Sequence, residues 1–174
     1  MAFFVFLTLF LPFKNNAQIN LQHSVYAELA GSAGIYSINY DLIAFKFNDL
    51  KLGARAGLSF LSEGYEGSSV DLHLPITLNL MYTFKEHHHA ELGIGTQIAS
   101  YEIRKINSAE DVGFTRKTEA LGNYTLGYRY QQPEGGFMFR VFYSPFFYQD
   151  GIYFRYEHWA GLSIGYTFKN KSSK

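Results

Sequence analysis

The residues from Asp71 to Phe84 (DLHLPITLNLMYTF) constrain the fold of this chain more than any other stretch. One set of alternate positions is entirely apolar: Leu72, Leu74, Ile76, Leu78, Leu80, Tyr82 and Phe84. The other set is mixed and mostly polar: Asp71, His73, Pro75, Thr77, Asn79, Met81 and Thr83. Successive side chains of a β-strand point to opposite faces, so this alternation predicts one extended strand between two different environments.

The length of this strand points to a membrane. At about 3.3 Å per residue it would be on the order of 45 Å long, whereas an ordinary globular strand spans roughly 17–20 Å. Tilted by about 40°, it would cross an apolar band of about 25 Å with residues left over at both ends. We therefore interpret it as a transmembrane β-strand.

Seven other segments alternate in the same way, which predicts an all-β fold: an eight-stranded antiparallel up-and-down transmembrane β-barrel over residues 18–174. The seven segments are His23–Ala30, Gly34–Ala44, Leu50–Ser62, Glu91–Ile98, Ala120–Gln131, Phe137–Tyr143 and Ala160–Phe168. Short connections after the second, fourth and sixth strands would face the periplasm. Long ones at 62–69, Ser100–Lys117 and Ser144–Glu157 would face outside, and the short first outer connection is an exception.

The composition agrees with a barrel. Mean hydropathy is −0.11, too low for a bundle of apolar helices but compatible with strands that are apolar at every second position. A formal net charge of +0 gives no basic field for nucleic acid, and the absence of Cys excludes disulfides and thiolate metal sites. A soluble lipocalin-like barrel, with the apolar residues inside, is the alternative architecture.

Residues 1–17 begin with an apolar run, MAFFVFLTLFLPF, that has the length of a signal peptide. We expect cleavage after Ala17, although the run lacks a basic start and its first positive charge is Lys14. The alternative, an N-terminal anchor, needs a longer apolar run of about 20 residues.

The polar positions of the predicted strands carry charges of both signs, which we expect to pair inside the barrel. Eight strands leave room only for side chains, so the predicted result is a plugged lumen. The predicted lumen charge network is Glu28, Asp41, Arg55, Asp71, His73, Glu91, Arg129 and Arg140, with Lys51 and Gln97 on the same faces. A narrow channel or carrier for ions or a small ligand is the alternative.

Aromatic residues predict two further surfaces. Three strands end on pairs that would form a periplasmic aromatic girdle at the membrane interface: Tyr82 and Phe84, Tyr128 and Tyr130, and Tyr166 and Phe168. The aromatic loop between Phe146 and Trp159 is the candidate binding surface, because exposed aromatics with an Arg are typical of interfaces. Its candidate residues are Tyr148, Tyr153, Arg155, Tyr156 and Trp159.

No chemical motif in the sequence predicts catalysis. His87, His88 and His89 are adjacent, so their side chains should diverge in a solvated turn, and we expect no metal site and no cofactor. His73 near Asp71 could belong to a hydrolytic set in an enzyme that modifies lipid at the membrane surface. No nucleophile motif surrounds it, and a simply hydrogen-bonded His is the favoured interpretation.

Four segments carry a family resemblance: YSINYD at 36–41, GYRYQ at 127–131, PEGG followed by FMFR at 133–140, and WAGLS with GYTF at 159–168. In these segments the chain resembles the small, mostly uncharacterised outer-membrane β-barrel proteins of bacteroidete-type bacteria. The resemblance implies a Gram-negative outer membrane, contact with its lipid, and recognition of the last strand by the assembly machinery. Phe168 is followed by a polar tail, unlike a terminal signal. From all of this we expect a structural or adhesive role through the outer loops, with an unknown external ligand.

Overall fold

The computed structural model describes residues 18–61, 70–106, 112–150 and 153–168. The predicted signal peptide at 1–17, the outer connection at 62–69 and the polar tail at 169–174 lie outside these residues. Within the described part of the chain, no helix has the length and apolar character needed to cross a membrane.

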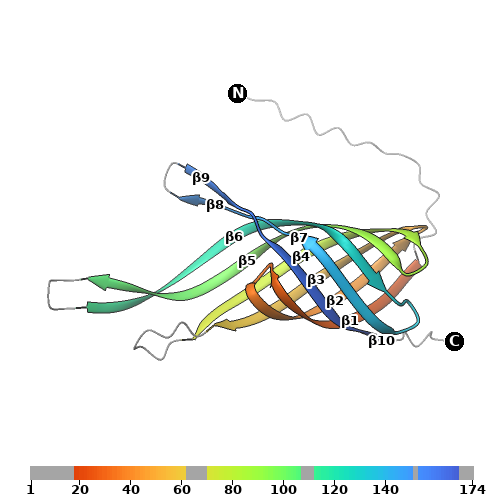
Figure 1. The fold of residues 1–174 in the computed structure, drawn as a ribbon, viewed down its shortest axis with the longest axis horizontal. Coiled ribbons are helices and arrows are strands. Elements are labelled where there is room, and N and C mark those ends of the chain that lie inside the picture. Colours follow the sequence, from red (N-terminus) through yellow and green to blue (C-terminus); the bar gives the residue numbers. More distant parts are fainter. Residues whose placement is uncertain (1–17, 62–69, 107–111, 151–152, 169–174) are drawn as a thin grey trace, which may run out of the picture.

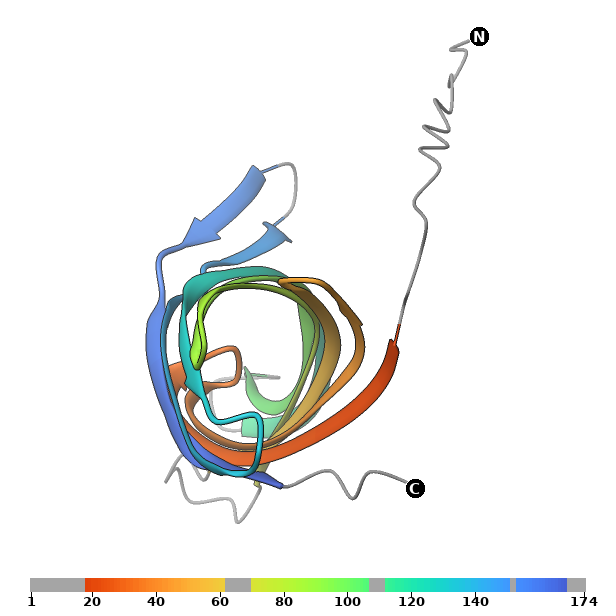
Figure 2. The same cartoon turned by 90° about the vertical axis from the view of Figure 1, so that its right-hand side faces the viewer.

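Eight strands form a closed antiparallel ring, which confirms the predicted up-and-down barrel (Figures 1 and 2). The ring contains β1 (Gln18–Gly31), β2 (Gly34–Phe47), β3 (Leu50–Leu61), β4 (Asp71–Lys85), β5 (His88–Ile106), β6 (Val112–Gln131), β7 (Gly136–Tyr143) and β10 (Ala160–Phe168). Each strand pairs with its neighbours in sequence, except that β7 pairs with β10, and β10 closes the ring against β1. The remaining strands, β8 (Phe146–Asp150) and β9 (Tyr153–Glu157), form a hairpin.

Apolar side chains point outward and polar side chains point inward. In β3 the burial pattern alternates from Leu50 to Phe60 without a break, with Leu52 exposed and Arg55 buried. Near the middle of their strands, Leu78 is 59% and Ile94 is 65% exposed. A soluble lipocalin-like barrel would have the opposite arrangement, so the structure contradicts that alternative. The outer surface is a continuous apolar band, which a soluble monomer does not normally expose.

A β-bulge preserves this alternation near the end of β2. The register against β3 shifts between Ile43 and Phe45, so Ala44 is an extra residue. After the bulge Phe45 is opposite the outward-facing Leu52, and Lys46 is opposite the inward-facing Lys51. The aromatic end of β2 therefore faces outward, and Lys46 lies on the lumen side.

The predicted long connection Ser100–Lys117 is wrong. β5 and β6 instead continue beyond the ring as a hairpin, paired up to Ile106 and Val112 (Figure 1). Both faces of this extension lie outside the apolar band, so its sequence lacks the alternation of apolar and polar residues that predicted the ring strands. Opposed charges mark it instead, because Glu102 pairs directly with Arg116 across the strands.

The third predicted long connection, Ser144–Glu157, contains the β8–β9 hairpin. β8 is joined to β6 through Phe147 opposite Gly122 and Phe146 opposite Asn123. Both hairpins project from the same end of the barrel, opposite the end with the short turns (Figure 1).

Candidate functional site

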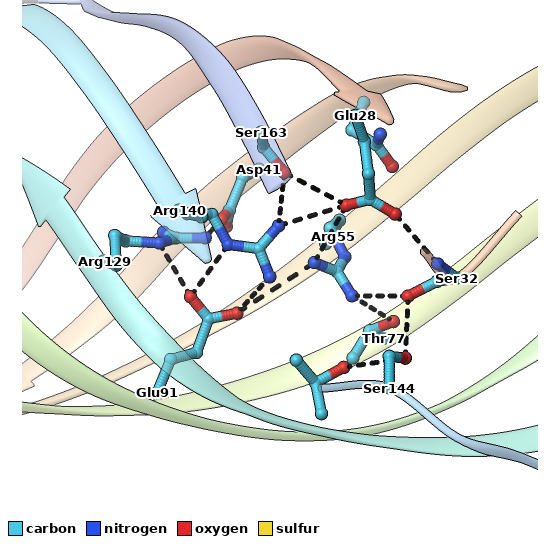
Figure 3. Close-up of polar contacts among 12 residues, drawn as sticks. Glu28, Ser32, Asp41, Arg55, Thr77, Glu91, Arg129, Arg140, Ser144 and Ser163 are labelled. Atoms are coloured by element: carbon cyan, nitrogen blue, oxygen red, sulfur yellow. Dashed lines mark hydrogen bonds and ion pairs between the residues drawn. The ribbon is translucent and has the colours of Figure 1, made fainter. Parts of the chain in front are cut away.

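Six charged side chains meet in the barrel interior, each from a different strand (Figure 3). We call them the lumen cluster: Glu28, Asp41, Arg55, Glu91, Arg129 and Arg140. Each is at most 2% exposed. The three guanidinium groups balance the three carboxylates, which is the condition under which so many charges can be removed from water.

Glu91 is at the centre of the lumen cluster. Its two oxygens accept a bidentate pair of hydrogen bonds from Arg140, with Nη2 at 2.6 Å and Nε at 3.1 Å. The same carboxylate forms ion pairs with Arg129 Nε at 2.8 Å and with Arg55 Nη1 at 4.0 Å. Bidentate pairs of this kind are among the stronger polar contacts in proteins. All three cations therefore depend on one carboxylate.

The other two carboxylates hold the edges of the lumen cluster. Arg129 Nη2 donates to Asp41, and Arg140 Nη1 donates to Glu28 Oε2 at 3.2 Å. Arg55 Nη1 lies 3.7 Å from the same Glu28 oxygen. The six groups thus form one connected network rather than three separate pairs.

Two aromatic residues that the sequence interpretation missed complete this network. The Tyr26 hydroxyl accepts hydrogen bonds from Arg140 Nη1 at 3.1 Å and from Arg55 Nη1 at 3.3 Å. The Arg140 guanidinium also lies over the ring of Phe142, 4.6 Å from its centroid. Their positions could have revealed them, because Tyr26 shares the inward parity of Glu28 and Phe142 shares that of Arg140.

The short β1–β2 turn closes the outer side of the lumen cluster. Ser32 and Ala33 are buried, and the turn lies inside the ring when the barrel is viewed along its axis (Figure 2). Ser32 N donates to Glu28 Oε1 at 2.9 Å, and Arg55 Nη2 donates to Ser32 Oγ at 3.1 Å. The exceptional short outer connection is therefore a cap on the interior.

Two glycines make room for this cap. A Cβ on Gly161 would come 1.6 Å from the main-chain oxygen of Ala30, and a Cβ on Gly31 would come 2.5 Å from Glu28 Oε1. Ala30 itself has a left-handed backbone, with φ of 41°. The inward path of the turn therefore depends on the absence of side chains at these two positions.

Asp71 and His73, which were predicted in the same charge network, lie at the outer end of β4. Asp71 accepts a hydrogen bond from the main-chain N of Glu102 at 3.1 Å. His73 Nδ1 contacts Gln97 Nε2. These contacts lie on the outer side of the lumen cluster.

The three consecutive histidines diverge, but not all of them lie in a solvated turn. His88 Nδ1 is 2.6 Å from the Tyr128 hydroxyl on the outer wall, and His87 packs edge-on against Tyr130. His89 is 0% exposed and lies in the lumen, which corrects the prediction for this residue. Among the described residues, no group of three or more His, Asp or Glu side chains is arranged to hold a metal ion.

The six predicted girdle residues lie at the barrel end with the short turns. Tyr82, Phe84, Tyr166 and Phe168 are exposed on the outer wall. Tyr128 packs beside Phe84, and Tyr130 packs beside Phe137. Phe45, Phe47 and Phe137 are exposed near the same turns and were missed, although each lies near the end of an alternating run.

The predicted binding loop divides into an inner and an outer part. Trp159 packs against Phe146 and donates from Nε1 to Gly34 O at 3.4 Å, so it supports the capping turn. Arg155 is exposed, and the Tyr148 hydroxyl donates to Glu157 Oε1 at 2.8 Å. The side chain of Tyr153 lies outside those that the structure describes.

Tyr156 belongs to a group that spans three strands, and we call this group the outer tyrosine cluster: Tyr124 and Tyr143, which are half-buried, and Tyr156 and His158, which are exposed. The Tyr156 hydroxyl contacts that of Tyr124 and lies 3.5 Å from that of Tyr143. These hydrogen bonds, first from Tyr124 and then from Tyr143, raise the pKa of Tyr156. Its ring lies 5.2 Å from that of His158. Tyr124 and Tyr143 were missed because they belong to ring strands rather than to the loop.

Solved structures share this fold. The chain is similar to the N-terminal β-barrel domain of Pseudomonas aeruginosa OprF, with a TM-score of 0.55 and 16% identity over 87% of this chain and 99% of that one. It is also similar to the Neisserial surface protein A, NspA, with a TM-score of 0.52 and 13% identity over 90% of this chain and 100% of that one. Both are eight-stranded outer-membrane barrels. At this identity the similarity establishes the fold alone. No protein-family model and no curated protein matches the sequence.

Proposed function

We propose that this protein is an outer-membrane β-barrel of a Gram-negative bacterium that displays two binding hairpins at the cell surface. The observation that carries the proposal is the inverted barrel, with apolar side chains outside and the balanced lumen cluster inside. An apolar outer wall with an aromatic girdle at one end matches a lipid bilayer. The similarity in fold to OprF and NspA supports the same environment.

The closed interior favours a structural anchor over a channel. The lumen cluster fills the middle of the barrel, and the β1–β2 turn covers its outer side through Ser32. An ion passing through would have to break several buried ion pairs at once, each costly to separate. We therefore propose that binding occurs outside the barrel.

The binding surface we propose is the pair of outer hairpins, formed by β5–β6 and β8–β9. The outer tyrosine cluster lies where the second hairpin leaves the ring and presents large, rigid aromatic rings. Such residues dominate the energetics of many interfaces. The external ligand would be a macromolecule at the cell surface.

Export and assembly follow from this proposal. Residues 1–17 would be cleaved as a signal peptide, and the assembly machinery would recognise β10, which ends on Phe168. The role needs no catalysis, so His73→Ala should leave lipid A unchanged in intact cells. Altered lipid A in that variant would instead favour a lipid-modifying enzyme.

Two measurements test the proposal together. After detergent-free lysis, the processed protein should sediment with the outer membrane and migrate differently on a gel with and without boiling. In planar bilayers it should give no steady single-channel conductance. Recovery in the soluble fraction would refute the membrane assignment, and regular conductance would refute the closed anchor.

A further inference from the structure

The barrel end with the short turns, which we call the inner mouth, carries two opposed lysines. Lys46 of β2 and Lys51 of β3 are direct cross-strand partners, so their side chains lie on the same, inward face. Lys51 is only 6% exposed. Like charges placed directly opposite each other destabilise a sheet, and burial increases that cost.

The protein offers these lysines little compensation. The six charges of the lumen cluster already balance one another. Asp49, Glu86 and Glu134 lie in turns at this end, but within the described residues none forms an ion pair with Lys46 or Lys51. Two other cations, Lys46 and Arg129, lie near Lys51. Lys51 is therefore a buried cation without an ion pair among the described residues, and the exposed Lys46 places a second positive charge opposite it.

A buried, unpartnered histidine nitrogen lies beside them. His89 is opposite Thr83 on one side and Arg129 on the other, and its charged neighbours include Lys51. Its Nδ1 lies 2.9 Å from the Thr83 hydroxyl, whereas Nε2 is buried and forms no hydrogen bond. The main-chain oxygen of Gln131 lies close to the ring, but outside hydrogen-bond geometry with Nε2. When the Thr83 hydroxyl donates to Nδ1, Nε2 carries the hydrogen, and Gln131 offers it only a poorly aligned acceptor.

We propose that the inner mouth binds a dianionic phosphate, either inorganic phosphate or a phosphomonoester, between Lys46, Lys51 and His89. A phosphate group carries close to two negative charges above neutral pH and several acceptor oxygens. It therefore matches the two lysines, and one of its oxygens would accept the hydrogen of His89 Nε2. The site faces the compartment that the short turns face, so it binds from the periplasmic side in the membrane proposed above.

The test uses the folded barrel in a neutral detergent without phospholipid, at neutral pH and constant ionic strength. Inorganic phosphate at about 100 times its Kd should raise the Tm by roughly 5–10 °C relative to chloride. The Lys51→Met variant should fold, because it loses a buried charge, and it should lose this phosphate-dependent rise. Lys85→Met is the matched control, since Lys85 is an exposed lysine at the same end of the barrel, and it should keep the rise.

Three outcomes would overturn the inference. The first is a wild-type Tm that is the same in phosphate and in chloride. The second is a Lys51→Met variant that responds to phosphate as the wild type does. The third is an equal rise with dimethyl phosphate, which carries one charge and would refute the match to two lysines. None of these outcomes bears on membrane location, which fractionation tests separately.

Discussion

Replacing Glu91 by Gln should destabilise the barrel strongly. Glu91 accepts two hydrogen bonds from Arg140 and forms ion pairs with Arg129 and Arg55. The Glu91→Gln variant keeps the size of the side chain but removes its charge. Three buried guanidinium groups would then share two carboxylates, those of Glu28 and Asp41.

The expected loss in the free energy of unfolding is about 3–5 kcal/mol, the usual cost of leaving a buried charge without its partner. A second substitution should recover part of it. Arg140→Met in the same chain leaves two cations and two carboxylates, so the double variant should be more stable than Glu91→Gln alone. The recovery is a coupling between contacting residues, which a double-mutant cycle isolates.

The assay is guanidinium unfolding of the protein in lipid vesicles, followed by the fluorescence of Trp159, the single Trp of the chain. Glu119→Gln is the control, because Glu119 pairs with Lys117 at the outer hairpin, where an exposed pair contributes about 0–1 kcal/mol. If Glu91→Gln costs as little as the control, water screens the interior and the lumen is not closed. That result would refute the reasoning.

The other predictions concern the capping turn, the outer wall and the outer hairpin. Gly161→Ala should cost about 2–3 kcal/mol in the same assay, because the new methyl group overlaps the main chain of the β1–β2 turn; an unchanged midpoint would contradict this. Leu78→Arg should cost about 2–4 kcal/mol in a bilayer, and a loss below about 1 kcal/mol would place Leu78 away from the lipid. The pKa of Glu119 is lowered by hydrogen bonds first from Lys117 and then from Tyr101. Tyr101→Phe should therefore raise that pKa, measured by carbon NMR. As the pH falls, the variant should then lose this stabilisation of the hairpin at a higher pH than the wild type does.

The ring could be predicted because each of its strands separates an apolar exterior from a polar interior. Because of that contrast, apolar and polar residues alternate with a period of two, as in β3. The alternation predicts both the strand and the inward direction of the Arg55 side chain. The same reasoning failed for the outer part of β5 and β6, where both faces lie outside the apolar band. There the opposed charges of Glu102 and Arg116 are a signal that the period of two does not give.

The arrangement inside the lumen was only partly predictable. Parity indicates that Glu28, Glu91 and Arg140 point inward, but not which of them touch, because contact depends on barrel stagger. It also cannot show that the β1–β2 turn folds inward, since the alternation stops where the turn begins. Gly161 lacks a side chain because the main chain of Ala30 comes close to it. Ala30 lies on a strand far away in sequence, so the sequence around Gly161 could not show why a glycine is needed there.

Direct contacts link the closed interior to the β8–β9 hairpin. Ser144, which follows β7, lies 3.4 Å from Ser32 of the capping turn, and its main-chain N donates to Trp159 O at 2.8 Å. Ser144 and Trp159, which flank the β8–β9 hairpin, are therefore attached to the turn that caps the lumen. Sites built on rigid elements hold their geometry better than sites on free loops. A change in the lumen cluster should thus reach the outer tyrosine cluster, which makes the polar interior a support for the binding surface as well as a seal.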